Sequence, residues 1–62
     1  MTITISTERQ YIENGNACIF FDGEYVYQDA FGYKAFKSIN GLNKHIAKVA
    51  KMANREAVKV IA

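Results

Sequence analysis

The sequence has no proline and no tryptophan, and its 62 residues include only one cysteine and one histidine. The single cysteine, Cys18, excludes an intrachain disulfide. Without a group of cysteines and histidines, a structural zinc site of the usual kind is excluded as well. A chain this short buries only about 60% of the surface that its unfolded form exposes. Its stability must therefore come from one small core or from association with a partner.

Long hydrophobic runs are also missing. No stretch approaches the roughly 18 apolar residues that a membrane span requires. The first six residues, Met-Thr-Ile-Thr-Ile-Ser, lack the basic and apolar regions of a secretory signal. A lone cysteine is typical of a reducing compartment. The sequence thus predicts a cytoplasmic protein without membrane contact.

The composition is that of a folded chain. Half of the residues are hydrophobic, four are tyrosine and four are phenylalanine, and the net charge is only +2. Disordered chains have few aromatic residues and a high net charge. At this length we expect a single domain that spans residues 1–62.

The first half of the sequence predicts strands. Asn14-Gly15 and Asp22-Gly23 are preferred central dipeptides of two-residue hairpin loops, because both positions need a positive φ. Around them, β-branched and aromatic residues alternate with polar ones. The predicted strands cover residues 2–6, 9–13, 16–21 and 24–28.

Two-residue loops fix the register, and the register assigns each residue to a face of the sheet. Such loops would pair Ile12 with Ala17, Cys18 with Tyr27 and Phe21 with Glu24. One face is then aliphatic, with Ile12, Ala17, Ile19, Phe21 and Val26. The other face is mainly aromatic, with Arg9, Tyr11, Cys18, Phe20, Tyr25 and Tyr27.

The second half changes to a helical pattern. Residues 29–37 are compatible with a loop or an irregular edge strand. Ser38 is a good N-cap, and an apolar stripe with helical spacing follows it. Asn54 is a plausible helix end, and residues 57–61 suit a short final strand. The predicted stripe consists of Ile39, Leu42, Ile46, Val49 and Ala53, broadened by Ala50 and Met52.

These elements predict an α+β fold in the order β-β-β-β-α-β. An antiparallel meander of three to four strands would pack against one amphipathic helix, and a short C-terminal strand would follow.

Residues with catalytic potential are few. Ser38 has a use as a helix cap, and Cys18 lies in mid-strand, where a buried and inert thiol is the common outcome. His45 can titrate near neutral pH, but no nucleophile or second metal ligand lies at an informative spacing. The sequence therefore predicts a protein that is not an enzyme, with no cofactor, no metal site and no small-molecule substrate.

Charge is distributed unevenly along the chain. Residues 1–29 have one cation and five acids, whereas residues 30–62 have seven cations and one acid. The outer side of the predicted helix carries a basic ridge of Lys44, Lys48, Lys51 and Arg55. Such a ridge can be a solvated helix face, or it can contact phosphates. Nucleic-acid binding through these four residues is one hypothesis.

The aromatic face gives the other hypothesis. One helix covers only one face of the sheet, and its apolar stripe matches the aliphatic face best. The aromatic face would then stay open, and tyrosine and phenylalanine are enriched at protein interfaces. We expect a non-enzymatic binding module that contacts a protein partner or a second copy through Arg9, Tyr11, Phe20, Tyr25 and Tyr27. Short chains of this kind are often accessory proteins of phages or mobile elements.

Overall fold

The computed structural model describes residues 2–20 and 22–62, and it confirms the α+β class with a meander packed on one helix. Residues 29–37, which the sequence leaves open, contain an edge strand that lengthens the meander to four strands. The order is thus β-β-β-β-β-α-β. The elements are β1 (Thr2–Thr4), β2 (Gln10–Ile12), β3 (Gly15–Ile19), β4 (Tyr25–Asp29), β5 (Gly32–Phe36), α1 (Ile39–Met52) and β6 (Lys59–Ile61).

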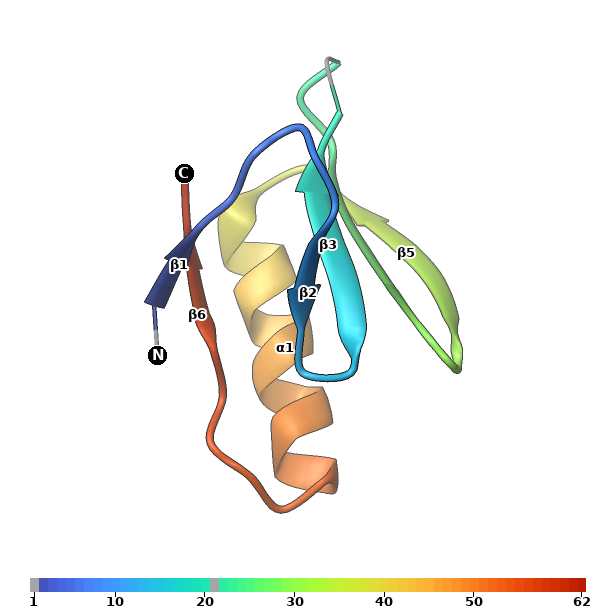
Figure 1. Ribbon diagram of the computed structural model, residues 1–62, viewed down its shortest axis with the longest axis vertical. Helices are drawn as coiled ribbons and strands as arrows, with labels where there is room; N and C mark the ends of the chain where they lie inside the picture. The colour runs from blue at the N-terminus through green and yellow to red at the C-terminus, as the bar shows by residue number, and fades with distance from the viewer. Residues whose placement is uncertain (1, 21) are drawn as a thin grey trace.

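The strands form two sheets that flank the helix (Figure 1). Strands β2, β3, β4 and β5 are antiparallel neighbours in chain order, whereas β1 pairs with β6 in parallel. After β1 the chain passes along β3, where the carbonyl of Ser6 accepts a hydrogen bond from the Ile19 amide at 2.9 Å. As a result, β6 lies on one side of α1 and β5 lies on the other.

The first hairpin turns one residue earlier than predicted. Glu13 and Asn14 have the positive φ angles, 47° and 64°, and Ile12 pairs with Gly15. Gly15 is needed inside the strand, because a Cβ there would lie 2.7 Å from the ring of Tyr27. The predicted pairing of Ile12 with Ala17 is therefore wrong. The shift is two positions in pairing, so the residues of this hairpin keep their predicted faces.

The second hairpin has a longer loop than predicted, and this changes the faces. The Phe20 amide donates to the carbonyl of Glu24 at 2.9 Å, so the chain reverses between these two residues. Gly23 takes the positive φ, 87°, that such loops need. Cys18 consequently pairs with Val26 and not with Tyr27.

This one-residue difference moves Tyr25 and Tyr27 to the face that α1 covers and moves Val26 to the opposite face. The prediction that the helix covers Val26 while both tyrosines face outward is wrong. The predicted pairing of Phe21 with Glu24, and the face assigned to Phe21, lie outside the described residues.

The helix begins and ends where its sequence predicts. The hydroxyl of Ser38 accepts a hydrogen bond from the Gly41 amide at 3.3 Å. At the other end Asn54 adopts the left-handed conformation with a φ of 55°, and the Arg55 amide donates to the carbonyl of Ala50. This pattern is the Schellman motif, which binds carbonyls of the last turn that would otherwise lack partners.

The core lies between α1 and the sheets. Leu42 and Ile46 of the helix are completely buried, and Tyr27, with 1% of its surface exposed, is a core residue beside them. Met52, which the sequence places on the apolar stripe, is instead 75% exposed. The buried cluster consists of Ile5, Ile12, Ala17, Tyr27, Leu42, Ile46 and Val60.

Candidate functional site

On the side that faces β6, the helix is bound to the strand through one side chain. The carboxamide of Asn43 donates to the carbonyl of Val60 at 2.8 Å and accepts from the Val60 amide at 2.8 Å. Nearby, the carboxylate of Glu13 accepts a hydrogen bond from the Val58 amide at 2.7 Å. We call this side, where hydrogen bonds of Asn43 hold the strand to the helix, the closed flank; a hollow of about 490 Å³ also lies on it, lined in part by Asn43, Lys44, Val58 and Lys59.

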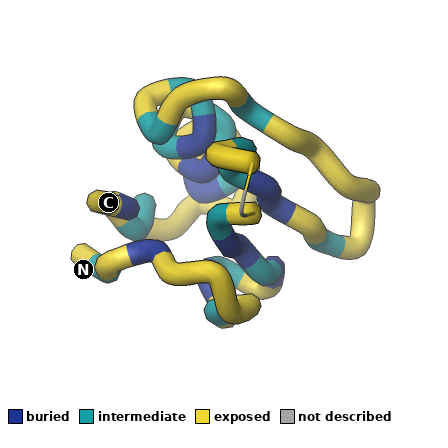
Figure 2. The backbone as a smooth tube through the Cα atoms, turned by 90° about the horizontal axis from the view of Figure 1, so that it is seen from above, coloured by how far each residue is buried: buried dark blue, intermediate teal, exposed yellow. Residues whose placement is uncertain are grey.

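On the side that faces β5, the helix is contacted mainly by Phe36, which packs against Gly41 and His45. The ring of Phe36 packs against Gly41, where an added Cβ would lie 3.2 Å from it. From Phe36 back towards Gly32 the strand diverges from α1, and these other four residues of β5 are exposed. Seen from above, this exposed stretch lies well away from the buried centre, on the side opposite the termini (Figure 2).

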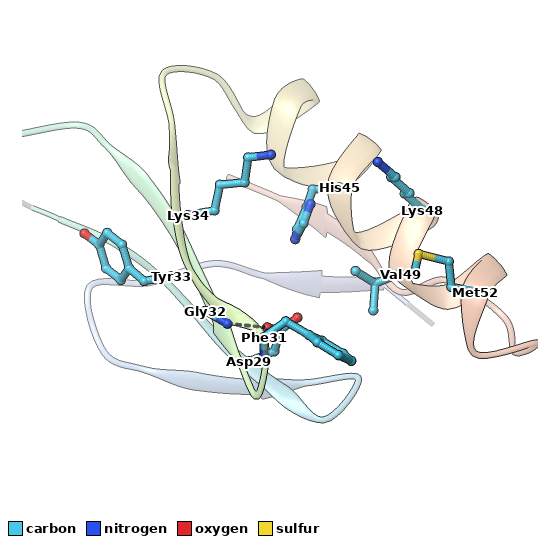
Figure 3. A pocket seen from close by; sticks show the side chains of 9 residues that line it. All are labelled: Asp29, Phe31, Gly32, Tyr33, Lys34, His45, Lys48, Val49 and Met52. Atoms are coloured by element: carbon cyan, nitrogen blue, oxygen red, sulfur yellow. Dashed lines mark hydrogen bonds between the residues drawn. The ribbon is translucent and has the colours of Figure 1, made fainter.

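The divergence leaves a groove of about 310 Å³ between β5 and α1, which we call the open-flank groove (Figure 3). It is lined by Asp29, Phe31, Gly32, Tyr33, Lys34, His45, Lys48, Val49 and Met52. The side chain of Tyr33 points away from the helix, whereas those of His45 and Val49 extend from the helix towards the strands. The groove therefore combines cationic and apolar groups from two elements.

His45 is partly buried in this groove. Its ring lies edge-on to Tyr27, with 5.3 Å between centroids, and is tilted against Phe36 at 5.5 Å. Neither ring nitrogen makes a hydrogen bond to another residue that the structure describes. Burial lowers the pKa of His45, and the charges of Lys34 and Lys48 lower it further, against an opposing effect of Asp29. At neutral pH the imidazole is thus uncharged, with one donor and one acceptor to offer.

Two lysines flank His45 from opposite walls. Lys34 pairs with Tyr27 across the sheet, so its side chain lies on the helix side of β5, and its ammonium is 5.9 Å from the centre of the Phe36 ring. Lys48 comes from α1, which contains no aspartate or glutamate. The sequence did not identify Lys34, because it lies in the segment without a clear period. Its alternation with Phe36 on one face of a strand was the available signal.

An exposed aromatic residue stands at the end of the groove. Phe31, at the tip of the β4–β5 hairpin, is 92% exposed. The carboxylate of Asp29 fixes this tip, because it accepts hydrogen bonds from the Phe31 amide at 2.8 Å and from the Gly32 amide at 3.2 Å. A second hollow of about 390 Å³ adjoins the first and shares Asp29, Phe31, Val49 and Met52 with it. Phe31 and Met52 together form an apolar lip between the two hollows.

The basic ridge predicted on the helix consists of three residues in the structure, not four. Lys44, Lys48 and Lys51 are exposed on α1. Arg55 lies beyond the helix end, and its guanidinium donates to the carbonyl of Glu13 at 2.8 Å. Arg55 therefore ties the end of the helix to the β2–β3 turn and does not continue a helical row. Lys34 extends the cationic surface across the groove in its place.

The five residues predicted to form one aromatic face lie on two faces. Tyr25 and Tyr27 contribute to the core side. Arg9, Tyr11 and Phe20 remain on the other side, all exposed. Tyr33 of β5 joins this open face, which surrounds the nearly buried side chains of Cys18 and Val26.

Comparison of the chain with protein-family models, with curated proteins and with solved structures found no match in any of the three. Within residues 2–20 and 22–62, no group of three or more potential metal-ligating side chains comes together. In that same part of the chain, no helix has the length and apolar character to cross a membrane. The site's own geometry thus carries the functional argument.

Proposed function

We propose that this protein binds nucleic acid through the cationic surface formed by α1 and β5. One observation carries the proposal: Lys34 and Lys48 stand on opposite walls of one groove, beside a helix free of acidic residues. Clustered lysines on one face are the electrostatic footprint of phosphate binding. Lys44 and Lys51 widen this surface along the exposed side of the helix.

The location of the acidic residues supports the proposal. Glu24 forms an ion pair with Lys37 at 3.2 Å, and Glu13 and Asp29 accept hydrogen bonds from backbone amides. Of these, only Asp29 lines the open-flank groove. A polyanion that approaches α1 therefore meets the lysines without a row of carboxylates between them. A reducing cytoplasm, where the buried thiol of Cys18 stays free, is the compartment that we propose for this activity.

A salt titration tests this function. Fluorescence anisotropy with short labelled oligonucleotides, from about 50 to about 200 mM salt, gives the slope of log K against log salt, to which each neutralised duplex phosphate contributes about −0.9. The Lys34→Gln and Lys48→Gln variants should each reduce the slope by about one. Lys59→Gln, on β6, removes the same charge outside the groove and serves as the control. Absence of binding at the lowest salt, or an equal effect of Lys59→Gln, would contradict the proposal.

A second candidate function, self-association, rests on the open sheet face. Cys18 and Val26 are nearly buried there although no helix covers them, and exposed Tyr11, Phe20 and Tyr33 surround them. A second copy is the occupant that we favour, because chains of this size often complete a small core by oligomerisation. Sedimentation velocity over a range of concentrations should then show a dimer that Tyr11→Ser weakens. A monomer at every concentration would rule this candidate out.

A further inference from the structure

We infer that the open-flank groove takes an unpaired base, so that the preferred ligand is a single-stranded nucleic acid. This inference rests on the proposed function and specifies its ligand. A flat row of lysines would suffice for duplex phosphates, but this groove has cations on its two walls and apolar side chains at its end. A nucleotide is divided in the same way, because its phosphate is anionic and the faces of its base are apolar.

Phe31 is the residue that distinguishes a base from a phosphate. Its ring is almost fully exposed, and its backbone is held by Asp29, so the ring is presented to solvent on a fixed turn. Exposed aromatic rings beside cationic grooves are the stacking platforms of single-strand binders. The bases of a duplex are already stacked on one another, and only an unpaired base can lie against this ring.

His45 supplies a polar group inside the groove. Its side chain extends from the helix into the space between α1 and β5 (Figure 3). Its ring packs edge-on to Tyr27 and at a tilt against Phe36, and its ring nitrogens are the polar groups that it can offer to a ligand. A neutral imidazole can donate to one group of the base edge and accept from another. Lys34 and Lys48, on either side, are placed to neutralise the adjacent phosphates.

The volume agrees with this assignment. The groove of about 310 Å³ lies at the lower end of the range for small-molecule sites. It continues past the lip of Phe31 and Met52 into the second hollow of about 390 Å³. The phosphates of a bound strand are expected to follow Lys34 and Lys48 while one base contacts Phe31, because the second hollow is also lined by Glu13 and Asp29.

The test compares a labelled thymidine oligonucleotide with a duplex of the same length. We expect tighter binding of the single strand. Phe31→Ala should weaken single-strand binding by about fivefold or more, with the salt dependence unchanged and the duplex affinity unaltered. Phe31→Trp should keep the affinity, because it retains a stacking surface. Phe31 is too exposed for either variant to affect folding, which circular dichroism will verify.

The outcomes separate this inference from the proposed function. Equal affinity for single strand and duplex, together with no effect of Phe31→Ala, would overturn the inference while the lysine-dependent binding stands. Failure of every oligonucleotide to bind would overturn both. Displacement of the single strand by polyglutamate at the same charge concentration would also overturn the inference, since the groove would then read charge alone.

Discussion

On the closed flank, α1 is joined to β6 by two hydrogen bonds of the Asn43 side chain, whereas on the open flank no side-chain hydrogen bond among the described residues joins it to β5. Asn43 satisfies both backbone groups of Val60, a residue that is almost completely buried. On the other side of the helix, the groove is lined by Lys34, His45 and Lys48, which contribute two charges and an imidazole. One side of the helix thus stabilises the fold, and the other side provides groups that can bind a ligand.

The contrast explains why the groove persists in such a small protein. The core residues and the closed flank hold the helix, and of β5 only Phe36 packs against the core while its other four residues stay exposed. Lys34 and Lys37 on and beside this edge strand also discourage pairing with another strand, because lysine on an edge is a common protection against such pairing. The open flank is accordingly available to a ligand of opposite charge.

The largest expected effect is at Tyr27, whose ring lies under the open flank. Tyr27→Ala removes a buried aromatic side chain, and such changes cost about 3–5 kcal/mol of unfolding free energy. A chain of this length has a total stability of about 3–9 kcal/mol, so we expect the variant to lose a large part of its stability. Urea denaturation followed by circular dichroism measures the loss.

Tyr11→Ala is the matched control for this variant. Tyr11 is 72% exposed, and surface truncations usually change stability by no more than about 0.5 kcal/mol. Equal tolerance of both truncations would show that Tyr27 is not part of the core and would refute the observed register.

Loss of Asn43 should be the next largest effect and tests the closed flank directly. Asn43→Ala leaves the amide and carbonyl of Val60 without their partner, at a cost of about 2–3 kcal/mol. Lys34→Ala truncates an exposed side chain on the open flank and should cost about 0.5 kcal/mol or less of unfolding free energy. Similar losses in the two variants would show that the flanks do not differ in the way described.

A smaller effect is expected at Gly15, where the first hairpin passes closest to Tyr27. Gly15→Ala places a methyl group 2.7 Å from the Tyr27 ring and 2.8 Å from the carbonyl of Gln28. Overpacking of this kind costs about 1–3 kcal/mol. Thermal unfolding would reveal it, and an unchanged midpoint would indicate that β3 and β4 are further apart than observed.

The smallest effects concern pH and His45, and they have opposite signs for folding and binding. The folded pKa lies below 6.5, so the stabilising contribution of His45 is present above that pH and is lost as the pH falls through the folded pKa. Lys34 and Lys48 disfavour the charged imidazole, and a bound polyanion would offset their effect and stabilise this form. In the free protein, Asp29 already favours the charged form. Nucleic-acid affinity should therefore rise as the pH falls through the pKa of His45, which is lowered from its ordinary value.

The variant His45→Gln should flatten both pH dependences, which chemical denaturation and anisotropy between neutral and mildly acidic pH will measure. An affinity that falls with decreasing pH would place the imidazole outside the bound complex.

Local signals in the sequence predicted the helix well. Ser38 and Asn54 act on backbone groups within a few residues, so their roles depend on little else. The loop between Phe20 and Glu24 shows the limit of such rules, because Asp22-Gly23 suits both a two-residue and a three-residue loop. That single residue decides whether Tyr25 and Tyr27 face the helix or the solvent.

The groove could be predicted only in part. Lys48 was visible as part of a helical row, but its counterpart Lys34 belongs to a strand that has no period of its own. The role of Arg55 was also hidden, because its partner, the carbonyl of Glu13, is 42 residues away in the sequence. Contacts between distant segments, rather than local patterns, create the difference between the two flanks.

The most direct test of the central claim is an NMR titration of the ¹⁵N-labelled protein with a single-stranded thymidine oligonucleotide. We expect shift changes at Phe31, Lys34, His45 and Lys48, with Ile3 and Val60 of the paired strands β1 and β6 unaffected. Changes centred on the closed flank, or on Tyr11 and the open sheet face, would contradict it.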